Sequence, residues 1–143
     1  MTVDTNVLFA ALYNPKGASA FIFDLFIREE IWFALSVPIF MEYQDVLKRK
    51  EILEKIGLEA HDVDAILRFI ADQASLFDIA YLWRPNLRDE ADNMFVECAI
   101  RSQSQFLITS NVRDFKLNNE LFFDDLEIVT PKEFVLSWRV NHE

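Results

Sequence analysis

Carboxylate and amide side chains stand next to apolar runs at four places in the sequence. They are Asp4, Glu42, the pair Asp89 and Asp92, and the pair Asn111 and Asp114. If such oxygen ligands met at one point, they would repel one another without a cation, and hard ions such as Mg²⁺ or Mn²⁺ suit carboxylate, amide and water ligands. A site of this kind leaves room for a phosphate oxygen and an activated water, which points to phosphodiester hydrolysis.

Each of these residues also has a purely structural interpretation. Asp4 interrupts an apolar, β-branched run, so it is either the cap of a strand-to-helix turn or one arm of a cation site. Asp89 could cap its helix, and Asp92 would then favour the positive end of the helix dipole. Glu42 could pair with Lys48 or Arg49. Asn111 and Asp114 could be ordinary turn residues.

Composition narrows the classes of protein that fit. The 143 residues suffice for one compact domain, 52% of them are hydrophobic, and the net charge is −10. A broad basic surface for nucleic acid is therefore excluded. The single cysteine, Cys98, permits no intramolecular disulfide, and no apolar run is long enough to span a bilayer. We expect a reducing, cytoplasmic setting.

Short apolar runs alternate with helical patterns along the chain, and we expect strands at residues 3–8, 31–35, 76–79, 106–109 and 126–129. Helices are expected at 19–29, from Ser36 to the basic run Lys48-Arg49-Lys50, at 51–56 closed by Gly57, at 61–74, and through Met94 to Ile100. Residues 110–125 read as a polar connection. Thr130-Pro131-Lys132-Glu133 is a capping box that opens a last helix.

This alternation predicts an α/β domain whose central, mainly parallel sheet of about five short strands is covered by helices on both faces. Neither a repeat nor a linker divides the sequence, so we expect one domain over residues 1–143. Because sites in open α/β sheets form beyond the carboxyl ends of the strands, the acids named above could converge there.

The same residues carry a resemblance to a known family. Asp4-Thr5-Asn6-Val7-Leu8 resembles the opening motif of the PIN-domain family, and the acidic run from Asp89 through Asp92 to Ala99 is similar to the central motif of its toxin-like branch. The segments 106–115 and 129–134 resemble the later motifs. The order and spacing of these motifs resemble those of the family over nearly the whole chain.

The resemblance implies a three-layer α/β/α domain and a metal-dependent endoribonuclease, the toxin of a type II toxin–antitoxin pair. Asp4, Glu42 and Asp92 would hold Mg²⁺ or Mn²⁺ and position the attacking water, and Asn111 would complete the catalytic set. Asn6, Asp89, Thr109 and Asp114 would support it. Asn111 stands where the family often has an aspartate, and only three residues precede Asp4.

Partners follow from these expectations. The substrate would be RNA, with Arg84, Arg88, Arg113 and Lys116 as candidates for phosphate contacts. A cognate antitoxin protein and a homodimer are the expected protein partners, and no membrane contact is expected. The alternative is a catalytically weak PIN domain that acts mainly as a protein-interaction module, which Asn111 and the −10 charge would suit.

Overall fold

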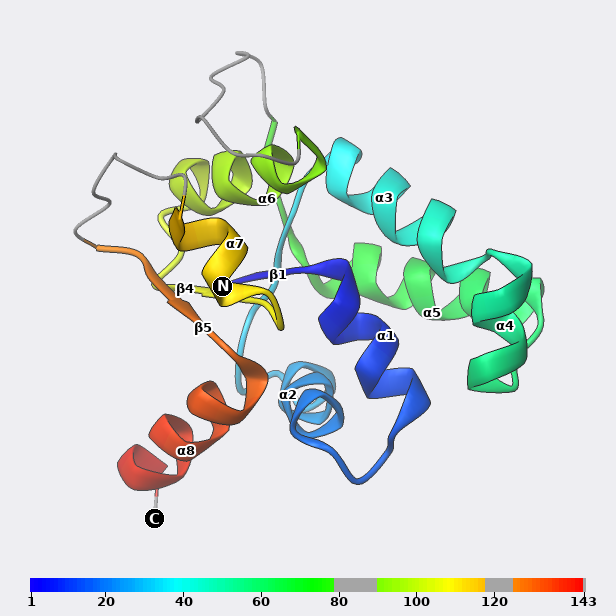
Figure 1. Cartoon of the computed structure of the whole chain (residues 1–143), viewed down its shortest axis with the longest axis horizontal. Coiled ribbons are helices and arrows are strands. Elements are labelled where there is room, and N and C mark those ends of the chain that lie inside the picture. Colours follow the sequence, from blue (N-terminus) through cyan, green and yellow to red (C-terminus); the bar gives the residue numbers. More distant parts are fainter. Residues whose placement is uncertain (79–89, 118–124, 143) are drawn as a thin grey trace.

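The fold rests on short parallel strands (Figure 1). The computed structural model describes residues 1–78, 90–117 and 125–142, with only the backbone for 90–93 and 116–117. The strands are β1 (Thr2–Val3), β2 (Ala34–Leu35), β3 (Ser75–Leu76), β4 (Phe106–Ile108) and β5 (Glu127–Val129). All three strand pairings are parallel, as expected for strands connected through helices.

β1 lies in the middle of this arrangement. It pairs with β4, Val3 standing opposite Ile108, and β4 in turn pairs with β5. β2 pairs with β3, and the Ala34 amide donates to the Met1 carbonyl at 2.7 Å, which places β2 on the other side of β1. The carboxyl ends of β1 and β4 therefore lie next to each other.

Helices cover the sheet on both faces, which gives the three-layer α/β/α fold expected from the sequence. They are α1 (Thr5–Tyr13), α2 (Ala18–Ile27), α3 (Val37–Leu47), α4 (Lys50–Ile56), α5 (Ala60–Gln73), α6 (Glu90–Arg101), α7 (Val112–Leu117) and α8 (Pro131–His142). α6 packs on β1, β2 and β4, whereas α2 packs between α1 and α8. Figure 1 shows α6 and α2 on opposite sides of β1.

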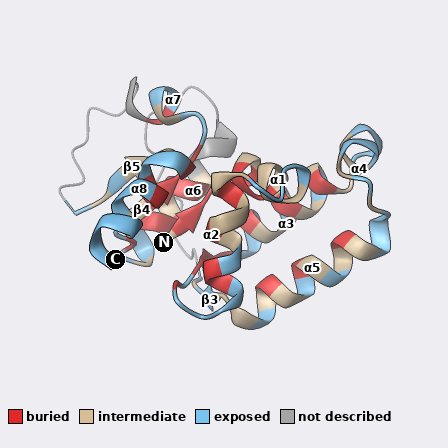
Figure 2. Ribbon diagram, turned by 90° about the horizontal axis from the view of Figure 1, so that it is seen from below, coloured by how far each residue is buried: buried red, intermediate tan, exposed pale blue. Residues whose placement is uncertain are grey.

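The core gathers around the central strands. Buried positions, shown red in Figure 2, concentrate on the strands and on the inward sides of the helices, whereas α4 has no buried residue. Phe26 stacks on Phe33 with ring centroids 4.1 Å apart, and α5 buries Val63, Leu67 and Ile70 at helical spacing. Within the described residues, no helix has the length and apolarity needed to cross a membrane.

Local signals fix several helix ends as the sequence predicts. The Ser36 hydroxyl accepts from the Ile39 amide at 3.3 Å, and Gly57 takes a left-handed conformation with φ 71° at the end of α4. Thr130 and Glu133 form the expected capping box, since each side chain accepts from the other's backbone amide at 2.9 and 3.1 Å.

Two expectations about the elements are wrong. The run at residues 3–8 is not one strand, because β1 ends at Val3 and α1 begins at Thr5. Asp4 caps that helix, and its carboxylate favours the turn over continued strand pairing. The connection at 110–125 contains the helix α7, in which Phe115 is fully buried and supplies the apolar contact that holds the helix.

Candidate functional site

Asp4 lies where β1 meets α1, and three donors hold its carboxylate. Its amide donates to the Ile108 carbonyl at 2.9 Å, which extends the β1–β4 pairing by one residue. Oδ1 accepts from the Thr5 amide at 2.7 Å, and Oδ2 accepts from the Thr109 hydroxyl at 2.6 Å and the Asn6 side-chain amide at 3.1 Å. Only 6% of Asp4 is exposed. The carboxylate is therefore fixed in one orientation.

Thr109 couples the ends of the two central strands. It follows β4 directly and is fully buried, and its hydroxyl donates to Asp4 across 105 residues of sequence. The same oxygen accepts from the Asn111 amide at 3.0 Å. One hydroxyl thus fixes both the carboxylate after β1 and the backbone that leads into α7.

Asn6 makes a second connection between the same two segments. Its side-chain amide donates to Asp4, and its side-chain oxygen accepts from the Ser110 amide at 3.2 Å. We call Asp4, Asn6, Thr109 and the backbone of Ser110 and Asn111 the Asp4 corner. Its contacts orient the Asp4 carboxylate and also join the segment after β1 to the segment after β4.

α3 brings Tyr43 to the end of β1. The Tyr43 hydroxyl donates to the Val3 carbonyl, one residue before Asp4, and its ring lies 6.3 Å from that of Phe95 on α6. Burial, and then the negative charge of Asp4, raises the pKa of Tyr43 well above its ordinary value. Glu42, the residue before Tyr43, is half-buried. Lys48 and Arg49 form ion pairs with Asp64 and Asp45.

Some of the remaining candidate residues are described only in part, and others lie outside the described residues. The backbone of Asp92 is in the first turns of α6, but its side chain is outside the described residues, as are Asp89, Arg84 and Arg88 entirely. Asn111, Arg113 and Asp114 are exposed before and within the first turn of α7, and the side chain of Lys116 is not described.

The structure therefore brings Asp4, Asn6, Thr109 and Asn111 together. In the described part of the chain, no three His, Cys, Asp or Glu side chains come close enough to hold a metal. The donors that are described, carboxylate and amide oxygens with no sulfur or imidazole, fit a hard cation such as Mg²⁺ or Mn²⁺. Asp4 would be one ligand, and further carboxylates would come from Glu42 and Asp92.

Tyr43 is not among the site residues expected from the sequence, although its hydroxyl binds the residue before Asp4. The signal available was a tyrosine next to an acid on an inward-facing stripe, since a buried tyrosine hydroxyl needs a hydrogen-bond partner. That the partner is the Val3 carbonyl follows only from how α3 packs. Tyr43 is thus a candidate positioning residue for the end of β1.

Comparison with known proteins agrees with this fold. Residues 1–113 match the family model described as PIN domain, so the chain belongs to the PIN-domain family. PIN domains are generally nucleases that act on nucleic acid and use divalent metals. The chain is also 30% identical to Uncharacterized protein MJ1680 of Methanocaldococcus jannaschii, over 94% of this chain and 88% of that protein.

Proposed function

We propose that this chain is a metal-dependent endoribonuclease, with Asp4, Glu42, Asp92 and Asn111 as the catalytic set. The observation that carries the proposal is the buried Asp4 carboxylate, held at the joined ends of β1 and β4 by Thr109, Asn6 and the Thr5 amide. Membership of a nuclease family supports it. A carboxylate kept in place by donors of its own chain is suited to hold a cation without reorganising.

The cation would be Mg²⁺ or Mn²⁺, bound by Asp4, Glu42 and Asp92. When bound, it would polarise the phosphodiester and lower the pKa of a coordinated water. Thr109 and Asn6 keep the Asp4 oxygens pointing to one place. Asp89 and Asp114 would add negative charge nearby, and Arg84, Arg88, Arg113 and Lys116 would contact RNA phosphates.

The biological role we infer is that of the toxin in a type II toxin–antitoxin pair, acting in the cytoplasm with a cognate antitoxin protein and forming a homodimer. This inference rests on the resemblance of the motifs at 4–8, 89–99, 106–115 and 129–134 to the toxin-like branch. Growth arrest on induction of the parent, absent with an Asp4→Ala variant, would support it. Normal growth with abundant folded parent would contradict the toxin role.

RNA cleavage tests the chemistry. The parent is expected to cut single-stranded RNA with Mn²⁺, to stop when a chelator is added, and to recover when Mn²⁺ is restored. Arg68→Ala, on the exposed side of α5, is a matched control that should cut like the parent. Cleavage by Asp4→Ala at the parent rate, or cleavage insensitive to the chelator, would overturn the proposal. Metal binding without cleavage of any RNA would favour the weak, interaction-module alternative.

A further inference from the structure

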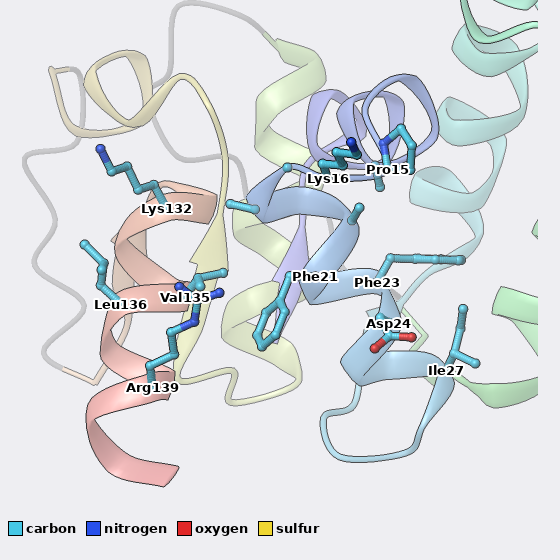
Figure 3. A pocket seen from close by; sticks show the side chains of 14 residues that line it. Pro15, Lys16, Phe21, Phe23, Asp24, Ile27, Lys132, Val135, Leu136 and Arg139 are labelled. Carbon is cyan, nitrogen blue, oxygen red and sulfur yellow. The ribbon is translucent and has the colours of Figure 1, made fainter. Parts of the chain in front are cut away.

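A groove between α2 and α8 lies apart from the Asp4 corner and shares no residue with it. It has a volume of about 650 Å³ and is lined by Ala11 of α1, by the turn after α1, by α2 and by one side of α8. Figure 3 shows the side chains of Phe21 on α2 and Val135 on α8 between the two helices, with Arg139 close by. The groove is large enough to receive several side chains of another molecule.

The floor of the groove is apolar and partly open. Phe21 and Phe23 are half-buried, while Ile27 and Leu136 are 44% and 53% exposed. Val135 is buried beneath them. Contiguous apolar surface of this kind, flanked by charged residues, is typical of a protein-interaction site.

The rim of the groove is positively charged in a chain whose net charge is −10. Lys16, Lys132 and Arg139 are all exposed, and none of them forms an ion pair with another residue that the structure describes. Among the lining residues that the structure describes, Asp24 is the one carboxylate, and it is paired with Arg28 at 3.0 Å. The groove thus offers cations to an incoming ligand.

The two cations of the rim on α8 stand differently towards its helix dipole, which favours Arg139 in the last turn. Lys132 lies in the first turn of α8, where a positive charge opposes the helix dipole. Arg139 lies over the Phe21 ring, 5.2 Å from its centroid, so a cation–π contact holds the guanidinium beside the apolar floor. Charge and apolar surface are therefore presented together.

We propose that this groove binds an acidic, amphipathic helical segment of another protein. Apolar side chains spaced along one side of that helix would contact Phe21, Ile27 and Leu136, as in other helix-in-groove complexes. Its flanking Asp and Glu residues would pair with Lys16, Lys132 and Arg139. The apolar floor favours a peptide over RNA, whose phosphates would leave that floor uncovered. The proposal does not depend on whether the chain cleaves RNA.

The test is a display selection of random peptides of about 16 residues, roughly four turns of helix, on the folded parent chain. Enriched peptides are expected to combine acidic residues with apolar residues at helical spacing. A Lys132→Glu/Arg139→Glu variant should bind them about 10-fold or more weakly, because two attractive pairs become repulsive. Leu136→Asp should weaken them independently, and Lys55→Glu/Arg68→Glu, which reverses two exposed cations on α4 and α5, is the charge-matched control.

Three results would overturn the proposal. One is enrichment of basic or uncharged peptides, or of none. Another is binding of the acidic peptides to the double variant as strongly as to the parent. The third concerns single-stranded RNA of mixed sequence. If the double variant binds this RNA more weakly than the parent does but binds the peptides equally well, the groove is a nucleic-acid surface. Circular dichroism of each variant shows that the fold is retained.

Discussion

The Asp4 corner and the α2/α8 groove use charge in opposite ways. In the corner a single buried carboxylate is held by short hydrogen bonds from its own chain, so its position is fixed before any ligand arrives. In the groove three exposed cations stand on a turn and a helix, and only Arg139 has a described contact that orients it. Fixed geometry suits chemistry at one atom, whereas exposed charge beside apolar surface suits an adaptable partner.

The largest effect is expected from removing the hydroxyl that fixes Asp4. Thr109→Val keeps the shape but removes the closer of the two donors described for Asp4 Oδ2, so the carboxylate is less firmly oriented and cleavage should fall by about 10- to 100-fold. The free energy of unfolding should fall by about 1–3 kcal/mol. Thr109→Ser, which keeps the hydroxyl, should retain most of both. Kinetics and urea unfolding check this, and equal loss in both variants would show that the hydroxyl is not what matters.

The next effect is the pH dependence of stability that comes from Cys98, which is buried on α6 beside the strands. Burial raises the pKa of its thiol to about 11. Below about pH 7.5 the thiol is neutral whether folded or unfolded, so its burial gives stability no pH dependence there. Between pH 9 and 11 the unfolded thiol ionises while the folded thiol stays neutral, so the free energy of unfolding should fall by about 2–3 kcal/mol. Urea unfolding of the parent and Cys98→Ala at both pH values isolates this slope, which the variant should lack.

A smaller effect is expected at Tyr43. Tyr43→Phe removes the donor to the Val3 carbonyl and should lower the free energy of unfolding by about 1–2 kcal/mol. If Tyr43 positions the end of β1, the variant should also bind Mn²⁺ more weakly, whereas a purely structural role would leave metal affinity unchanged. Calorimetry of the folded variant distinguishes the two.

The smallest effect is expected in the groove. Arg139→Ala removes an exposed side chain and one cation–π contact, so the free energy of unfolding should change by no more than about 0.5–1 kcal/mol. A loss as large as that of Thr109→Val would contradict the contrast between a fixed corner and an adaptable groove. Thermal unfolding of both variants in one buffer makes the comparison direct.

The sequence predicts the elements whose signals are local. The Ser36 cap, the glycine after α4 and the capping box at Thr130 and Glu133 each act within a few residues, and each stands as expected. The same reasoning fails at residues 3–8, because β-branched residues after Asp4 look like a strand until the cap is known. It also misses α7, whose six residues are held by the buried Phe115.

The sequence predicts the residues of the candidate site better than it predicts the hydrogen bonds between them. Asp4 and Asn6 stand out as polar groups in an apolar run, but the bond from Thr109 to Asp4 spans 105 residues and exists only once β1 and β4 pair. The bond from Tyr43 to Val3 likewise depends on how α3 packs. Such contacts leave no pattern in a single sequence, because the two partners are far apart in the chain and meet only when the elements pack.

The central claim is that the Asp4 corner holds a divalent cation, and calorimetry of Mn²⁺ binding tests it most directly. The parent should bind Mn²⁺ specifically, and Asp4→Asn, which keeps the size but removes the charge, should bind at least about 10-fold more weakly while remaining folded. Equal affinity in parent and variant, or no specific binding by the parent, would contradict the account.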